Sequence, residues 1–406
     1  MGYFSSVNLN IKIMATNPNN SNKTYSLLTI ERLNMITVNT TEELKNIIHE
    51  RAKLNKDAFI LDVSDIDISK LTSLKDAFAL CSNAVLIQGL ELWNTSNIVN
   101  MSGMFRGCYN LEELDLSNFI TSNVKDMSYM FSGCRNLNLH DLPTFDTSNV
   151  ESMAYMFRCC VRITELNLAN FQTSNVKNMC GMFSDCEYLK SLDLSNFDTS
   201  NVKSMGHMFS DCKRLTSLDL SNFDTSNVKS MAYMFDYCRG LITVDLSGFD
   251  TSNVKSMCWM FHDCESLTTL DLSHFNTINV ENMAYMFNDC KSLCSLDLSN
   301  FDTSNVINLV HMFDNCNHLE VLHILNFRTP KLKYIDKMFK NCSALRYLDL
   351  SLFNVSSVEK NPKQMFKNCK ALETLKLPQF NKNNMIEHDS FEGCESLHLF
   401  SIDVFN

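Results

Sequence analysis

Positive charge is scarce in this chain and never dominates over a long stretch. Its 406 residues include 35 Lys and Arg against 46 Asp and Glu, which gives a formal net charge of −11. The one segment with a basic excess, residues 328–340, is short and lies between acidic repeats. Because a nucleic-acid surface needs a basic stripe that neutralises phosphates, we expect no nucleic-acid partner.

Long apolar runs are also missing. No stretch of about 20 apolar residues occurs, so we expect no membrane span. The first residues, MGYFSSVNLNIKIMA, lack the basic start, the apolar core and the small-residue cleavage site of a secretory signal peptide. We therefore expect neither a membrane helix nor a signal peptide.

Sequence motifs typical of catalytic and metal-binding sites are missing as well. The sequence contains no Gly-rich phosphate loop, nucleophile elbow, CxxC pair, zinc-type Cys/His cluster or calcium-binding loop. A catalytic site also needs a unique constellation of groups, which a strict repeat does not offer. We expect no enzymatic activity, no cofactor and no metal ion.

What the sequence has instead is a 26-residue unit that repeats through most of its length. Residues 215–240, LTSLDLSNFDTSNVKSMAYMFDYCRG, represent the unit. A fixed period of this size indicates stacked copies of one supersecondary unit. A cysteine marks the same slot in thirteen units: Cys81, Cys108, Cys134, Cys160, Cys186, Cys212, Cys238, Cys264, Cys290, Cys316, Cys342, Cys369 and Cys394. In such a column we expect reduced thiols that pack as small apolar residues, because parallel side chains have poor disulfide geometry.

Each unit predicts a strand, a turn and a short helical segment. The pattern LxxLxL alternates with period two, as a half-buried strand requires, and the turn formers DTSN follow at residues 224–227. A face that repeats every three or four residues then indicates a short helix or 3₁₀ segment, formed by Val228, Met231, Phe235 and Cys238. Stacked, about 13 such coils predict a leucine-rich-repeat-like solenoid.

The repeat also suggests how the chain is divided. Residues 1–34 form an N-terminal extension, partly strand or flexible, and residues 58–406 form the solenoid. Between them, residues 35–57 contain the capping box TTEE and an amphipathic helix, which we expect to cover the first coil. At the far end, the strand-like residues 400–405 either provide an edge for self-association or are frayed.

The unit LTSLDLSNFDTSNVKSMAYMFDYC resembles the repeat of the BspA-type leucine-rich-repeat surface proteins. It is most similar to the variant of mycoplasmas and gut bacteria, LDLSNFDTSNVTNMSxMFxxC, and the similarity spans about residues 58–394. The resemblance implies a β-solenoid-like leucine-rich repeat without a catalytic site, and adhesion to host proteins or other cells. It also implies surface display or secretion, whereas the many free cysteines fit a cytoplasmic protein, so the compartment stays open.

Two slots outside the core form rows that could bind a partner. The residue before the Met-Phe pair is aromatic in seven units, with Gly181 interrupting: Tyr129, Tyr155, His207, Tyr233, Trp259, Tyr285 and His311. These rings either tighten neighbouring coils or form an exposed interaction surface. The slot between the two strand leucines is acidic, and its central members are Asp193, Asp219, Asp245, Asp271 and Asp297. Their carboxylates either bond to nearby Ser and Thr, or bind a basic or polar protein, or bind divalent cations.

These observations predict a non-catalytic repeat scaffold that binds protein, with the aromatic and acidic rows as candidate surfaces. The alternative is a structural spacer or a self-assembling solenoid without a dedicated ligand.

Overall fold

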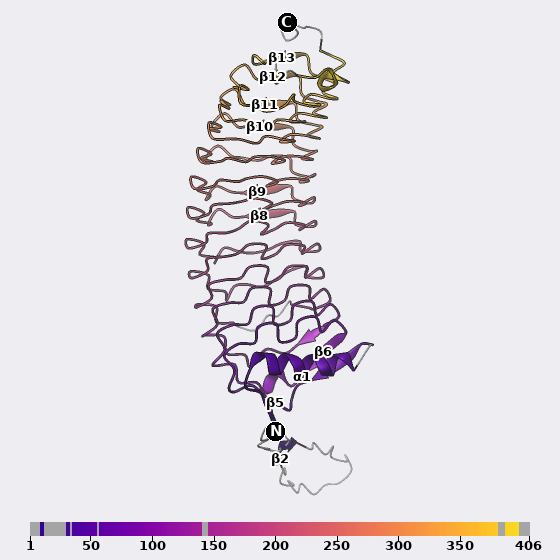
Figure 1. Ribbon diagram of the computed structural model, residues 1–406, viewed down its shortest axis with the longest axis vertical. Coiled ribbons are helices and arrows are strands. Elements are labelled where there is room, and N and C mark those ends of the chain that lie inside the picture. Colours follow the sequence, from indigo (N-terminus) through magenta and orange to yellow (C-terminus); the bar gives the residue numbers. More distant parts are fainter. Residues whose placement is uncertain are drawn as a thin grey trace, which may run out of the picture.

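The computed structural model describes residues 9–11, 30–32, 35–54, 57–139, 145–380 and 386–397. It is a β-solenoid of about 13 coils, stacked along one axis with helix α1 (Thr41–Lys53) at the N-terminal end (Figure 1). The solenoid predicted from the repeat is therefore confirmed. The predicted strand at residues 400–405, and the self-association attributed to it, lie outside the described residues.

The strands are short and pair mainly in parallel, coil upon coil. At the N-terminal end, β3 (Ile36–Thr37) pairs with β5 (Ile66–Asp67), and β6 (Ala84–Gln88) lies between β4 (Phe59–Asp62) and β7 (Glu113–Leu114). Further along, three pairs stack in parallel: β8 (Ser217–Asp219) with β9 (Thr243–Asp245), β10 (Ser295–Asp297) with β11 (Val321–His323), and β12 (Tyr347–Asp349) with β13 (Thr374–Lys376). The other elements are an antiparallel pair and two 3₁₀ turns: β1 (Leu9–Ile11), β2 (Ile30–Arg32), η1 (Leu90–Leu92) and η2 (His388–Phe391).

The register repeats the period of the sequence. Leu218 lies opposite Val244, and Ser295 lies opposite Val321, so in these two pairs each strand residue meets its counterpart 26 positions later. Every slot of the repeat therefore becomes a column along the solenoid axis. An outward slot becomes a surface row, and an inward slot becomes part of one continuous core.

The segment expected as a short helix or 3₁₀ segment, the last third of each coil, is a run of consecutive turns with isolated bonds of the 3₁₀ type. The Met234 N–H bonds back to the Met231 carbonyl at 3.2 Å, whereas the Phe235 N–H bonds to the Met260 carbonyl of the next coil at 2.9 Å. Alternate amides thus leave the coil, which an α-helix does not allow. The physical cause is left-handed backbone at two slots, φ 61° at Tyr233 and 58° at Tyr237, since such residues interrupt a right-handed helix.

The core consists of columns of identical side chains. Thirteen stacked phenylalanines run from Phe78 to Phe391, with ring centroids 5.4–5.9 Å apart. A second column runs from Phe223 to Phe353. Stacked rings add about 0.5–1.5 kcal/mol per pair beyond their buried area, so these columns both fill the core and hold its register.

The cysteine column has a hydrogen-bonding role besides packing. From Cys108 to Cys394, each thiol donates to the backbone carbonyl of a phenylalanine in the preceding coil, at 3.0–3.2 Å. All 17 cysteines are free thiols in the structure. Burial raises the pKa of Cys238 and its counterparts, so the thiol form that donates is the stable one.

Polar columns close the turn of each coil. Buried threonines such as Thr225 donate to a carbonyl of the next coil, at 2.8 Å from Thr225 to Asp250. Turn asparagines donate the other way, and the Asn227 amide lies 2.8 Å from the Ser200 carbonyl. Both sets satisfy backbone groups that would otherwise lose their hydrogen bonds between coils.

Helix α1 covers the first coil. The Thr40 hydroxyl accepts the Glu43 N–H at 3.1 Å, and the Glu43 carboxylate accepts the Asn39 N–H at 2.7 Å, as the capping-box pattern predicts. Leu44 and Ile48 are fully buried beneath the helix.

Candidate interaction surface

The aromatic residues before the Met-Phe pair stack on one another along the solenoid. Tyr129 and Tyr155 form one pair, with centroids 4.9 Å apart. Five further rings form a continuous stack with centroid distances of 3.9–5.7 Å and interplanar angles of 6–11°: His207, Tyr233, Trp259, Tyr285 and His311. These seven residues are called the aromatic ladder below. The structure thus brings together every aromatic residue that the sequence proposed for this row.

Gly181 divides the ladder into its two parts. A Cβ atom at Gly181 would lie 2.1 Å from the Tyr155 ring, so this ring occupies the space that a side chain would take. The Tyr155 hydroxyl also lies 3.3 Å from the Cys180 thiol. The glycine therefore lets Tyr155 lean over the following coil, which fills the gap in the row.

The backbone under the ladder is left-handed, which is unusual for large side chains. All seven ladder residues have φ between 55° and 62°. For residues other than glycine, this conformation costs about 1–2 kcal/mol. Each stacked ring pair returns about 0.5–1.5 kcal/mol, so stacking roughly offsets the strain. Gly103 and Gly181 show that glycine, which carries no such cost, also occupies this slot.

Stacking covers the faces of the ladder rings but leaves their edges at the surface. Tyr129 is 37% exposed, and the other six residues are partly buried. Because neighbouring rings lie on both faces of Tyr233, Trp259 and Tyr285, the exposed part of these side chains is their outer edge. Partial burial also raises the pKa of Tyr233 and Tyr285, so both phenols stay neutral hydrogen-bond donors near pH 7.

Two His–Asp pairs involve the ladder or its immediate neighbours, and the sequence analysis predicted neither pairing. His262 Nδ1 lies 2.6 Å from the Asp236 carboxylate, and the imidazole packs edge-on against Trp259 at 4.4 Å. His311 Nδ1 lies 2.7 Å from Asp314. Asp236, His262 and Asp314 occupy the slot after the Met-Phe pair. The residue in this slot varies from coil to coil, and that variability was the available signal. Within the described residues, no Ser, Thr or Cys side chain forms a hydrogen bond to either imidazole.

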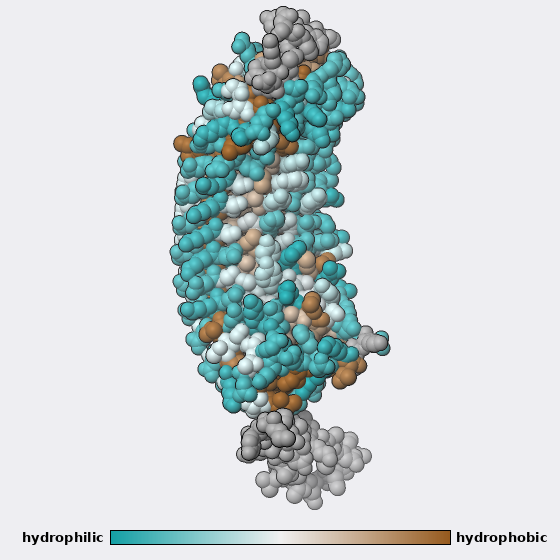
Figure 2. Space-filling view, in the orientation of Figure 1, coloured by the Kyte–Doolittle hydropathy of each residue, from teal (hydrophilic) through white to brown (hydrophobic). Residues whose placement is uncertain are grey.

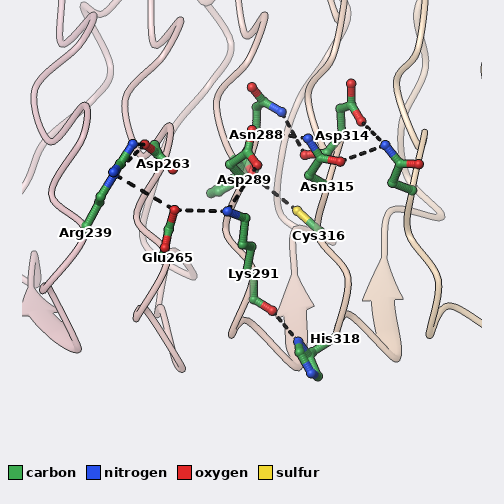
Figure 3. Close-up of polar contacts among 12 residues, drawn as sticks. Arg239, Asp263, Glu265, Asn288, Asp289, Lys291, Asp314, Asn315, Cys316 and His318 are labelled. Atoms are coloured by element: carbon green, nitrogen blue, oxygen red, sulfur yellow. Dashed lines mark hydrogen bonds and ion pairs between the residues drawn. The ribbon is translucent and has the colours of Figure 1, made fainter.

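A network of ion pairs and amide hydrogen bonds links neighbouring coils in the middle of the stack (Figure 3). Arg239 binds Asp263 at 2.6 Å, and Lys291 binds Glu265 at 2.9 Å, each across to a neighbouring coil. Asn288 donates to the Asp314 backbone carbonyl at 2.8 Å. These contacts fix the spacing of the middle coils, which carry the largest rings.

The acidic row lies on the strand segments, away from the ladder. In each of its five residues the carboxylate accepts the N–H of the serine two positions later, at 2.9 Å: Asp193, Asp219, Asp245, Asp271 and Asp297. Hydrogen bonds from Ser221 and Ser299 lower the pKa of Asp219 and Asp297, so both stay ionised. Figure 2 shows hydrophilic residues in rows that run from coil to coil along the stack.

A shallow hollow of about 840 Å³ runs over four members of this row, together with exposed Ser and Thr side chains. Within the part of the chain that the structure describes, no hydrogen bond or ring contact joins the acidic row to the ladder. The two rows are therefore separate surfaces. Over the same residues, no group of three or more His, Cys, Asp or Glu side chains is arranged to hold a metal ion. None of the described helices combines the length and the apolar character needed to cross a membrane.

Comparison with solved structures finds other leucine-rich-repeat proteins. A leucine-rich repeat protein from Bacteroides ovatus is 16% identical, with 98% of this chain and 93% of that chain covered and a TM-score of 0.43. One from Eubacterium ventriosum is 15% identical, with 90% of each chain covered and a TM-score of 0.40. A leucine rich cell surface protein from Faecalibacterium prausnitzii is 18% identical, with coverage of 60% and 74% and a TM-score of 0.30.

The family comparison is more direct. No curated protein matches the chain. The family described as "Mycoplasma protein of unknown function, DUF285" matches in overlapping segments at residues 72–166, 131–241, 159–267, 216–320 and 293–399. These segments include both the aromatic ladder and the acidic row. The resemblance found in the repeat is thereby confirmed, and the chain belongs to the DUF285 family of BspA-like leucine-rich-repeat proteins.

Proposed function

We propose that this chain is a non-catalytic scaffold that binds a protein partner through the exposed edges of the aromatic ladder. The observation that supports this most is the run of five rings from His207 to His311 in a left-handed slot that glycine would fill without strain. Stacking explains why the faces of these rings are covered, but it does not explain why their aromatic edges lie at the surface. A strip of Tyr and Trp edges has the composition that protein interfaces favour.

The acidic row is the second contact in this proposal. Its carboxylates use one oxygen for the local turn, and their charge remains at the surface beside the hydroxyls of Ser217 and Thr243. A partner with basic or polar groups would complement this face. With the family resemblance, we propose adhesion to a host protein or to another cell as the setting of this binding.

The experiment compares partner capture by three forms of the full chain. The ladder variant carries Tyr233→Gly, Trp259→Gly and Tyr285→Gly, because glycine already occupies this slot at Gly103 and Gly181. The control carries Lys203→Ser, Lys229→Ser and Lys255→Ser, exposed positions outside the ladder in the coils of His207, Tyr233 and Trp259. Each form is immobilised and exposed to host-cell extract and to bacterial lysate, and captured proteins are quantified by mass spectrometry.

We expect at least one protein to be captured by the wild type and the control and to fall at least tenfold with the ladder variant. Circular dichroism and thermal unfolding confirm that all three forms are folded. Equal capture by the folded ladder variant would contradict the proposed surface and favour the spacer role.

A further inference from the structure

In the middle of the stack, residues that follow the column cysteine form balanced charge pairs. Glu187 binds Lys213 at 3.0 Å, and Glu265 binds Lys291 at 2.9 Å, each across one coil. Such pairs leave little net charge on this edge of the stack. The coils that contain Cys134 and Cys160 depart from this pattern.

In these two coils, arginines replace the balanced pairs. Arg135 follows Cys134 directly, and Arg162 comes two positions after Cys160; both are exposed. Among the described residues, neither guanidinium forms an ion pair or a side-chain hydrogen bond. Arg135 rests on the ring of Tyr109, at 5.0 Å, in a cation–π contact that holds its side chain in place.

Three other arginines of the solenoid have carboxylate partners, whereas Arg214, Arg328 and Arg346 have no ion pair among the described residues. Arg106 binds Asp76 at 3.3 Å, Arg158 binds Asp185 at 3.0 Å, and Arg239 binds Asp263 at 2.6 Å. The chain as a whole has an excess of acidic residues, so carboxylates are not in short supply. What sets Arg135 and Arg162 apart is that they lie in neighbouring coils and line the same hollow.

Both arginines line one hollow of about 800 Å³, called the arginine hollow below. Its wall also contains the amide of Asn136, the ring of Tyr188, and the carboxylates of Asp185 and Glu187. Those carboxylates are already bound, by Arg158 and Lys213 at 3.0 Å each. The charge left facing the hollow is that of the two arginines.

We propose that the arginine hollow binds a tetrahedral oxyanion, the sulfate or phosphate group of a ligand. A guanidinium presents its N–H groups in a fixed fork that matches such oxygens, and two positive charges match a dianion better than a single carboxylate. The Asn136 amide and the edge of Tyr188 supply further polar and aromatic contacts. The site rests on residues outside the aromatic ladder and the acidic row, so it stands independently of the proposed protein-binding surface.

The test is calorimetric titration of the full chain with inorganic phosphate and with inorganic sulfate, at an ionic strength held constant with sodium chloride. The site variant carries Arg135→Gln and Arg162→Gln. The control carries Arg328→Gln and Arg346→Gln, which removes the same charge from exposed residues outside the hollow. We expect saturable binding by the wild type and the control, and at least tenfold weaker binding by the site variant.

Equal affinity in the wild type and the folded site variant would overturn the proposal. So would an equal loss in both variants, which would indicate general charge attraction, and so would no saturable binding by the wild type. A sulfated disaccharide and a phosphoserine peptide, each compared with its unmodified form, then distinguish the source of the group. Binding of either carrier that depends on Arg135 and Arg162 supports the site.

Discussion

Two slots in each coil have positive φ, and the coils fill these slots differently. The second slot takes mostly Gly, Asp or Asn, as at Gly133, Asp211 and Asn315, which are the residues that tolerate this backbone best. The first slot takes large rings in the middle of the stack. At the residue scale, the second slot therefore reflects the backbone conformation alone. The first slot also reflects contacts between the side chains of neighbouring coils.

Leu80 provides a direct test of the free-energy cost of a left-handed backbone at a residue other than glycine. It occupies the second slot with φ 64° and is 64% exposed, so its side chain gains little from packing. We expect Leu80→Gly to raise the free energy of unfolding by about 1 kcal/mol, because the left-handed strain disappears. Leu325, 55% exposed and without positive φ, is the control: Leu325→Gly should lower stability. Urea unfolding measures both, and a loss for Leu80→Gly comparable to that of the control would contradict the strain.

His207 makes a different prediction, on pH. Burial within the ladder lowers the pKa of His207 from its ordinary value of 6.5. Between the folded and unfolded pKa values the unfolded chain binds more protons, so stability falls as the pH drops below 6.5 toward the folded value. We expect His207→Phe, which keeps a stacking ring, to remove this part of the pH dependence. Thermal unfolding from pH 7.5 to 5 tests it; identical profiles for both forms would exclude His207 as the titrating group.

At the scale of the element, each coil is held by columns that link it to its neighbours. Its strand is only three residues long at β8, and its turns bond alternately within the coil and to the next one. A coil alone would leave half of these amides without partners. The first coil therefore needs a cover, and α1 supplies it by burying Leu44 and Ile48.

The contribution of the N-cap to the stability of α1 can be tested by removing one hydroxyl group. Thr40→Ala removes the acceptor of the Glu43 N–H and should destabilise the helix by about 1 kcal/mol. Asn46→Ala, at an exposed position inside the helix, should have no such effect. Hydrogen exchange of α1 and of β3 gives the measurement. Unchanged protection in Thr40→Ala would show that packing on Leu44 and Ile48 alone holds the helix.

The strand and the apolar columns could be predicted from the sequence, because the periods of Leu218, Phe235 and Cys238 fix which side chains point inward. The turn segment could not. A spacing of three and four residues is typical of a helix, and nothing in the letters of Tyr233 or Tyr237 indicates a left-handed backbone. The burial of Thr225 was likewise hidden, since Thr in a DTSN turn normally faces solvent.

The candidate surfaces, too, could be predicted from the sequence only in part. The repeat predicted that the ladder residues form a row, and stacking between coils produced it. The arginine hollow escaped prediction because Arg135 and Arg162 occupy different slots of their units and come to line one hollow only when the coils stack.

At the scale of the whole molecule, the repeat turns each variable slot into a continuous surface along the stack. The ladder and the acidic row are two such surfaces, whereas the arginine hollow is local to neighbouring coils. A ligand that spans several coils can contact each row many times, and the energy of binding is then spread over weak, repeated contacts.

The most direct test of the central claim is hydroxyl-radical footprinting of the chain alone and with the partner captured as described above. We predict that oxidation of Tyr233, Trp259 and Tyr285 falls at least threefold in the complex, while exposed aromatic residues outside the ladder, such as Tyr334 and Tyr347, oxidise as before. Unchanged oxidation of the three ladder residues in a complex that is demonstrably formed would contradict the ladder as the contact surface.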